Sequence, residues 1–177
     1  MPDYIAFLRA INLGANRKFP KADIIAATQA AGMTDDETHI NTGNVRLTST
    51  LRSRAKVRAA LEEAYLADRG FAVPAIVFTV DELRAITERG SELRADNVEG
   101  SRHYVYLLHE PPPQAAVDAV HALDFPDERI IVEGRAAYGL VPSVQGSRAF
   151  NSKELAALGE GTSRTITVLQ AITAKWC

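Results

Sequence analysis

The sequence predicts an α+β protein built from two tandem ferredoxin-like units, each with βαββαβ order and an antiparallel sheet, followed by a closing C-terminal helix. Three observations predict this class. A short apolar run, Tyr4–Leu8, recurs as Tyr104–Leu108. Each run is followed by the same succession of a helical pattern, two strand patterns around a glycine, a second helical pattern and a last strand. Hydrophobic residues make up 46% of the 177-residue chain and charged residues 24%, which is typical of a globular protein.

The first unit is expected over residues 1–90. Tyr4–Leu8 is a continuous apolar run, as in a central strand that is covered on both faces. Pro20 suits the first turn of a helix that Gly32 would end. Residues 39–47 predict two strands that meet at a hairpin centred on Gly43, where glycine supplies a positive φ.

The rest of the first unit is predicted from caps and breakers. Ser53 is the expected start of a helix that ends at Gly70. Residues 71–78 predict an edge strand, because Pro74 cannot donate to a sheet ladder. Thr79 and Glu82 have the spacing of a capping box, and we expect them to open a short helix that reaches Ile86.

The second unit is expected over residues 103–177, after a linker at 91–102. The linker is expected because residues 89–102 are polar and include Gly90 and Gly100. Its first helix should follow Pro113, and a hairpin should turn at Glu133-Gly134. Asn151 and Glu154 resemble a capping box at the start of a short helix. Residues 162–166 predict the last strand, and residues 168–176 the closing helix.

Composition limits the possible functions. The formal net charge of -2 does not support a general nucleic-acid binder, although a local basic patch is compatible with it. The single cysteine, Cys177, permits neither an internal disulfide nor a cysteine metal site, so we expect a cytoplasmic protein. No apolar run approaches the ~18 residues of a membrane span, and no secretory signal is evident. The four histidines show no ligand spacing, so neither a metal nor a cofactor is expected.

One polar stretch is longer than a connection requires. The step from strand to helix runs from Leu8 to Pro20 in the first half, but only from Leu108 to Pro111 in the second. Such connections usually need roughly 2–6 residues, and long ordered loops are often functional. The candidate ligand-binding residues of this stretch are Arg9, Asn12, Gly14, Asn16 and Lys18.

A second polar stretch should lie beside this loop. In the predicted topology the first two strands run in the same direction, so the loop and the hairpin lie at one end of the sheet. The hairpin adds Asn41, Gly43 and Asn44 to the candidates. The loop also leads into a helix N-terminus, whose amides and dipole favour an anion. A purely structural interpretation stays open, because Asn and Gly commonly form turns and Arg9 could pair with Asp3 or Glu37.

The second half has its own long loop, residues 141–153, which ends in Ser152 and Lys153. It is predicted at the opposite end of its sheet. If the halves pack about a pseudo-two-fold axis, this loop could face the first one in a shared cleft, and we state that as a hypothesis.

Four short pieces of the sequence resemble the signatures of a bacterial family known as domain of unknown function 1697. The opening signature is similar to residues 8–14 with Asn16, Lys18 and Pro20. The other three are similar to Ile40–Val45, to Ser152-Lys153 with Leu155, and to Thr162-Ser163-Arg164. The resemblance implies paired ferredoxin-like units, adds Arg164 to the candidate site and implies no activity. The chain departs from the family at Ala10, at Ala15 and at Thr165-Ile166-Thr167, where Asn-Trp-Asn is usual.

Three functions are compatible with these features. The first is a small cytosolic protein that binds an anionic ligand, a nucleotide or nucleic-acid phosphate. The second is an enzyme that acts on a phosphorylated or carboxylate metabolite, with His39 or Lys153 as proton carrier. The third is an interaction module that uses exposed sheet edges. No motif assigns a reaction, the balance is against an enzyme, and the oligomeric state is open.

Overall fold

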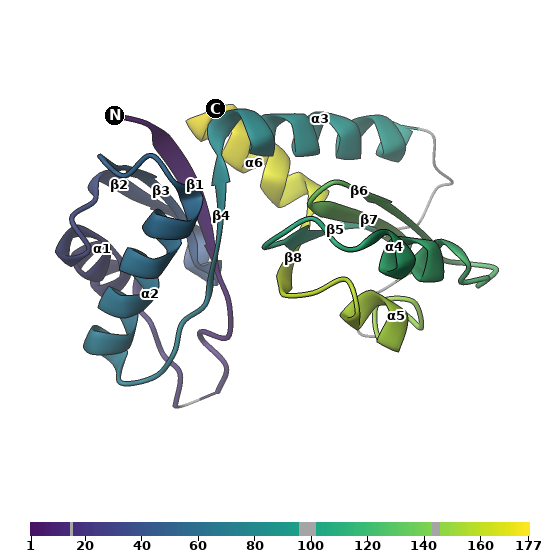
Figure 1. Ribbon diagram of the computed structural model, residues 1–177, viewed down its shortest axis with the longest axis horizontal. Coiled ribbons are helices and arrows are strands. Elements are labelled where there is room, and N and C mark those ends of the chain that lie inside the picture. Colours follow the sequence, from purple (N-terminus) through teal and green to yellow (C-terminus); the bar gives the residue numbers. More distant parts are fainter. Residues whose placement is uncertain (15, 96–101, 143–145) are drawn as a thin grey trace. The chain divides into compact units, whose positions relative to one another are not determined.

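A computed structural model describes residues 1–14, 16–95, 102–142 and 146–177 of the chain (Figure 1). Within these residues the protein is of mixed α+β class, with two four-stranded antiparallel sheets and six α-helices. The chain divides into two compact units, residues 1–83 with 176–177 and residues 84–175. Among the described helices, none combines the length and apolar character needed to span a membrane. Ala15, part of the predicted linker (96–101) and part of the second long loop (143–145) lie outside the described residues.

The first sheet has the strand order β2-β3-β1-β4. β1 is central and buried along Tyr4–Leu8, which confirms the predicted central strand. β4 begins directly after Pro74 and lies at the edge, as the proline predicts. The elements of this unit are β1 (Asp3–Leu8), α1 (Lys21–Ala30), β2 (Thr34–His39), β3 (Asn44–Thr48), α2 (Arg54–Arg69) and β4 (Ala75–Thr79).

Helices α1 and α2 cover one face of the first sheet (Figure 1). Successive side chains of a strand point to opposite faces, so Tyr4, Ala6 and Leu8 share this face. They form one buried cluster with apolar residues of both helices. Tyr65 of α2 is fully buried, and its hydroxyl is 2.8 Å from the Thr28 hydroxyl of α1. The hydrogen bond satisfies both polar groups inside the core.

The turn between β2 and β3 differs from the predicted simple hairpin. A short 3₁₀ helix, Ile40–Thr42, precedes Gly43, which has the expected positive φ of 73°. A Cβ atom at Gly43 would lie 2.8 Å from both Leu8 Cβ and Ile11 Cδ1. Glycine is therefore required here by conformation and by close packing.

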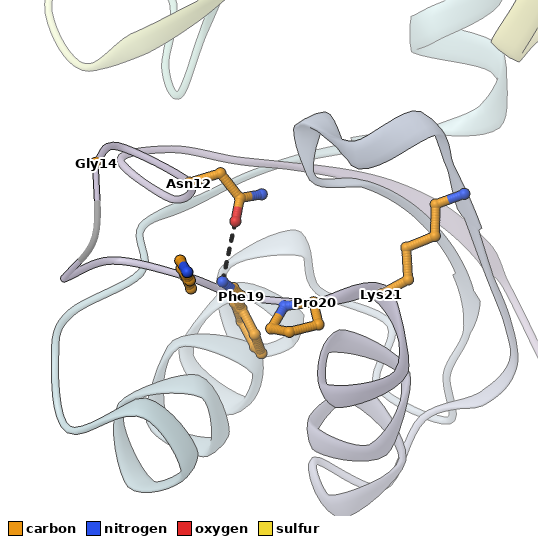
Figure 2. A pocket seen from close by; sticks show the side chains of 6 residues that line it. Asn12, Gly14, Phe19, Pro20 and Lys21 are labelled. Atoms are coloured by element: carbon orange, nitrogen blue, oxygen red, sulfur yellow. Dashed lines mark hydrogen bonds between the residues drawn. The ribbon is translucent and has the colours of Figure 1, made fainter.

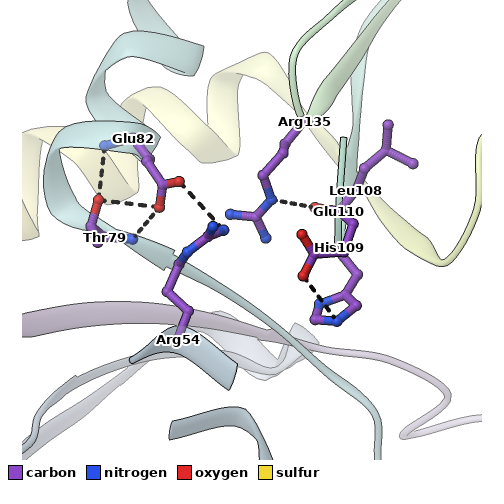
Figure 3. A network of polar contacts seen from close by, with 7 residues as sticks. All are labelled: Arg54, Thr79, Glu82, Leu108, His109, Glu110 and Arg135. Carbon is purple, nitrogen blue, oxygen red and sulfur yellow. Dashed lines mark hydrogen bonds and ion pairs between the residues drawn. The ribbon is translucent and has the colours of Figure 1, made fainter. Parts of the chain in front are cut away.

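Helix α3 (Val80–Ala95) starts as predicted and ends later. The Thr79 N–H donates to Glu82 Oε2 at 2.9 Å and the Glu82 N–H donates to Thr79 Oγ1 at 3.2 Å, which is a capping box (Figure 3). The Arg54 guanidinium forms an ion pair of 3.4 Å with the Glu82 carboxylate. Figure 3 shows these two side chains pointing toward each other. The predicted end at Ile86 is wrong, because the helix continues through Gly90 and takes in residues 91–95 of the expected linker. A Cβ at Gly90 would lie 2.6 Å from Ile166 Cδ1, so this glycine permits close helix packing.

The second sheet has the order β6-β7-β5-β8. The predicted hairpin at Glu133-Gly134 is confirmed by the pairing of β6 with β7. Two boundaries differ: Ser152 rather than Asn151 caps α5, accepting the Leu155 N–H at 3.1 Å, and Ile166 begins the last helix rather than ending a strand. The elements are β5 (Arg102–Leu108), α4 (Gln114–His121), β6 (Arg129–Glu133), β7 (Ala136–Val141), α5 (Lys153–Ala156), β8 (Gly161–Thr165) and the closing helix α6 (Ile166–Trp176).

Helices pack on both faces of the second sheet. Ala137 of β7 belongs to the cluster with α4 and α5, whereas Tyr138, on the opposite face, lies against α3 at Gly90. Leu108, Val120 and Leu155 join β5, α4 and α5 in one buried cluster. Two hydrogen bonds of 2.9 Å join α6 to α3: Gln170 Nε2 donates to Ser91 Oγ, and the hydroxyl of Thr173 pairs with that of Thr87. This contact with α6 explains why α3 is longer than predicted. Residues 87–95 contain no local sequence signal for it.

Candidate functional site

The loop of residues 9–20 and the turn of residues 40–43 lie together at one end of the first sheet. The Leu8 N–H donates to the Gly43 carbonyl at 2.7 Å, and Phe7 is paired with Asn44 across β1 and β3. The expectation that the two polar stretches are neighbours is therefore confirmed for the backbone. The side chains of the loop and of the turn make different contacts.

Asn12 closes the loop on itself. Its side-chain oxygen accepts the Phe19 N–H at 3.0 Å, and its backbone N–H donates to the Arg17 carbonyl at 2.6 Å. Ala10, Asn12 and Gly14 all have positive φ, between 54° and 66°. Positive φ is uncommon for residues other than glycine, so these contacts hold the loop in a strained path.

Arg17 fastens the loop to a different segment. Its guanidinium donates to the Ala10 carbonyl and, at 2.7 Å, to the Ala72 carbonyl, and it lies over the Phe71 ring. Arg17 therefore supports the loop from the side of the segment that precedes β4.

A pocket opens where the loop enters α1 (Figure 2). Its volume is about 540 Å³. Lys18 and Lys21 are exposed at this position, whereas Phe19 is buried beneath it. Pro20 caps α1 without a side-chain hydrogen bond, so the first amides of the helix have no acceptor from a capping side chain. The lining consists of Asn12, Gly14, Lys18, Phe19, Pro20 and Lys21.

Three of the predicted ligand-binding residues line this pocket, and one lining lysine was missed. Asn12, Gly14 and Lys18 were candidates from the sequence. Lys21 was not, although its place directly after Pro20 makes it the first residue of the helix. A lysine at that position adds a positive charge beside the first amides of the helix. The Pro20-Lys21 pair at the expected helix start was the sequence signal for this residue.

Asn44 is a structural residue of the turn. It is completely buried, and its amide donates to the His39 carbonyl at 3.0 Å and to Thr42 Oγ1 at 2.9 Å. Gly43 is packed against Leu8 and Ile11. Asn41 belongs to the 3₁₀ turn itself.

Arg9 and Asn16 are at the loop but outside the described lining of the pocket. Arg9 is half-buried, and its backbone N–H donates to the Pro74 carbonyl at 2.9 Å. Asn16 is exposed. Of the two carboxylates considered as partners of Arg9, Asp3 forms an ion pair of 3.1 Å with Arg46. A hydrogen bond from Thr48, together with this arginine, lowers the pKa of Asp3.

His39 and Glu37 contact Trp176, the single tryptophan of the chain, which belongs to the first unit. Trp176 Nε1 donates to Glu37 Oε2 at 2.9 Å, and the rings of Trp176 and His39 meet edge to face at 5.9 Å. His39, one of the two proton carriers considered for the enzymatic alternative, is thus part of an aromatic contact. In the part of the chain that the structure describes, no three His, Cys, Asp or Glu side chains are grouped as metal ligands would be.

The remaining candidates lie in the second unit, where Ser152 and Arg164 form local hydrogen bonds and Lys153 is exposed. The Ser152 hydroxyl caps α5 and donates to the Ala149 carbonyl at 2.7 Å. Lys153 extends into solvent, 3.9 Å from Glu154. Arg164 donates to Thr162 Oγ1 at 2.9 Å and to the Ser163 carbonyl at 2.8 Å, and burial lowers its pKa to about 10.

Sequence reasoning missed the residue that organises the loop before α5. The Glu128 carboxylate accepts from the Ser147 hydroxyl at 2.7 Å and from the N–H groups of Arg148 and Ala149 at 2.9 and 2.8 Å. Burial raises the pKa of Glu128, but these donors outweigh it and the pKa is lowered. A lone Glu before a strand gives no sign of this role.

Comparison with known proteins agrees with the signatures noted above. The sequence matches the profile of the protein of unknown function family DUF1697 over residues 1–138. The chain belongs to this family. The match includes the loop and the turn, and it ends before Ser152, Lys153 and Arg164.

The fold is shared with a solved bacterial structure. Described as conserved bacterial protein SP0830 from Streptococcus pneumoniae, it is 20% identical to this chain, with a TM-score of 0.79. The similarity covers 99% of this chain and 98% of that one. No curated protein matches the sequence.

Proposed function

We propose that this protein binds a small anionic ligand, a nucleotide or another phosphate-bearing compound, in the pocket at the start of α1. One observation carries the proposal: a single pocket of about 540 Å³ combines Lys18 and Lys21 with the first turn of the helix. This volume lies within the roughly 300–1,000 Å³ of small-molecule sites. A protein with a net charge of -2 is better suited to a small ligand than to a nucleic-acid polymer.

The chemistry of the pocket favours an anion. The two lysine ammonium groups each offer three donors and a full positive charge. The first amides of α1 and the helix dipole add partial positive charge at the same place. At Gly14 a Cβ would meet no atom within 4 Å, so the backbone there is open to a ligand. Asn12 holds the loop in place through its bond to the Phe19 N–H, while Lys18 and Lys21 neutralise the ligand.

Thermal denaturation with added anions tests the proposal. Phosphate, sulfate, AMP and ATP are added separately to the full-length protein. A ligand at 100 times its Kd stabilises the folded state by ~2.7 kcal/mol. We expect a rise in Tm with at least one of these anions, and its loss in the double variant Lys18→Ala/Lys21→Ala.

The matched control is the double variant Arg52→Ala/Lys56→Ala, at two exposed cations outside the pocket. It also removes two positive charges and should keep the rise in Tm. Equal stabilisation of the double variant and the wild type would refute the site. Failure of all four anions to raise Tm would refute the anion class.

We also propose the finer description of the fold, a tandem pair of ferredoxin-like units in a cytoplasmic protein. Both units share one element order and one strand order. They also share a hydrogen bond at the end of the first strand: the Leu8 N–H donates to Gly43 O at 2.7 Å and the Leu108 N–H to Arg135 O at 2.9 Å. A crystal structure whose two units superpose strand for strand, and fractionation of cells that contain the tagged protein, test these two statements.

A further inference from the structure

A second hollow of the first unit lies between α1 and α2, outside the anion pocket. Its volume is about 610 Å³. Apart from two carboxylates, every residue that lines it is an alanine. The lining is Ala26, Ala27 and Ala30 from α1, Ala31 directly after it, and Ala60, Glu63, Ala64, Ala67 and Asp68 from α2.

The alanines follow the helical repeat on both sides. Ala26 and Ala30 are four residues apart on α1, and Ala60, Ala64 and Ala67 follow at intervals of four and three on α2. Residues at these intervals share one face of a helix. Since a methyl group is the largest side chain on either alanine row, a third helix can approach the groove closely. Packed helices lie ~8–10 Å apart, at a distance set by the side chains in the contact.

The groove carries negative charge. Glu63 is exposed, and within the described residues it forms no ion pair. Asp68 is bonded to Arg69 Nε at 2.6 Å, and Arg69 also pairs with Asp23 at 2.9 Å, so Asp68 is partly neutralised. The described lining contains no lysine or arginine to oppose Glu63.

A large apolar side chain is exposed beside the groove. Leu66 is 50% exposed and lies three residues after Glu63 on α2. Both residues also line a smaller hollow of about 350 Å³ between α2 and residues 72–74. The smaller hollow is also lined by Arg58 and Glu62, which form an ion pair of 2.7 Å with each other. Glu63 is therefore the acidic residue that the two hollows share, and Leu66 is the exposed apolar side chain beside it.

We propose that the groove between α1 and α2 docks a basic amphipathic helix of a partner protein. Large apolar side chains of the partner fill the alanine-lined groove and contact Leu66, and its lysines or arginines face Glu63. An apolar helix face in a hydrophobic groove is a common mode of peptide recognition, and complementary charge selects the partner. This surface is independent of the anion pocket.

Two synthetic helical peptides test the proposal. One has leucines at positions i, i+3, i+4 and i+7 and lysines elsewhere, and the other has glutamates in place of the lysines. Both carry a fluorophore, and anisotropy measures their binding to the full-length protein. We expect the lysine peptide to bind at least about tenfold more tightly, and its binding to weaken as salt screens the charges.

Three variants locate the binding. Ala30→Arg places a long basic side chain in the groove, and Glu63→Lys reverses its charge. Each substitution should weaken the binding of the lysine peptide by about tenfold or more. Circular dichroism checks that both variants are folded. Glu88→Lys makes the same charge change on α3, outside the groove, and should leave binding unchanged.

Every alternative result overturns the proposal. Absence of binding, equal affinity for both peptides, or full binding to Ala30→Arg and Glu63→Lys would each exclude a basic helix in this groove. Sedimentation velocity of the protein alone provides a further test. A dimer that Ala30→Arg dissociates would assign the groove to a second copy of this chain instead.

Discussion

The guanidinium of Arg17 lies over the ring of Phe71, with its central carbon 4.5 Å from the ring centroid. The same group donates to the Ala72 carbonyl at 2.7 Å. The long loop that carries the candidate site is thus attached to the segment that leads into β4. Because Arg17 holds the loop, the neighbouring Lys18 can be directed to the pocket.

Replacement of Arg17 should loosen the loop without disturbing the core. Arg17→Ala removes the cation–π contact and the bonds to two carbonyls, and we expect a loss of about 1–2 kcal/mol in the free energy of unfolding. Urea denaturation measures the loss. Arg52→Ala, at an exposed arginine, is the control. Equal effects of the two substitutions would show that Arg17 does not stabilise the loop.

Two glycines with similar φ should respond differently to alanine. Gly43 has φ 73° and Gly32 has φ 79°, but a Cβ would collide with Leu8 and Ile11 only at Gly43. Gly32→Ala should cost about 1–2 kcal/mol of stability from the backbone alone. Gly43→Ala should cost about 2–5 kcal/mol, because overpacking adds to the backbone strain. Similar Tm values for both variants would contradict the close packing at Gly43.

His103 should make the protein less stable in mild acid. It is 6% exposed, and neither ring nitrogen has a hydrogen-bond partner among the described residues. Burial, with a smaller effect of the Arg94 charge, lowers the pKa of His103 from 6.5 to about 4. The unfolded chain therefore binds more protons between these values, so stability is complete above pH 6.5 and falls as the pH drops towards 4.

Comparison with His103→Phe isolates this effect. Denaturant titrations at several pH values should show that the wild type loses ~2 kcal/mol more than the variant between neutral pH and pH 4. Parallel stability curves for the two proteins over this range would show that His103 is not responsible.

Glu128 should contribute stability at neutral pH that acid removes. Its pKa is below the ordinary 4.5 because donors from Ser147, Ala149 and Arg148 outweigh the effect of burial. A lowered carboxyl pKa contributes stability above the unfolded value, and this is lost as pH falls through the folded value. Glu128→Gln should therefore cost about 1–2 kcal/mol at pH 7 and progressively less below pH 4.5. A difference between the proteins that does not depend on pH would contradict this account.

Local signals predicted most of the elements. The apolar run of β1, Pro20 before α1, Gly70 after α2 and the capping box of Thr79 and Glu82 all lie where their chemistry suggested. The predicted end of α3 at Ile86 was wrong. Gly90 suggested a break in the helix, but the packing of this glycine against Ile166 favours a continuous helix.

The candidate site was predictable in place but not in its details. The surplus length of the loop pointed to residues 9–20, and strand direction placed the turn of residues 40–43 beside it. Asn44 was chosen for its amide, but burial commits that amide to the turn. Lys21 and the alanine groove were missed, since each depends on which residues two separate elements bring together.

The sequence by itself determined the class, the order of strands and helices, the family and the polar loop, because these depend on periodicity, caps and chain length. Only the tertiary structure decided which polar groups are used inside the fold and which are presented to solvent. Arg17 and Lys18 are adjacent and both basic, yet one contacts Phe71 and the other lines the pocket. Residue type sets what a side chain can bind, but the neighbours brought by folding decide whether it is already bound.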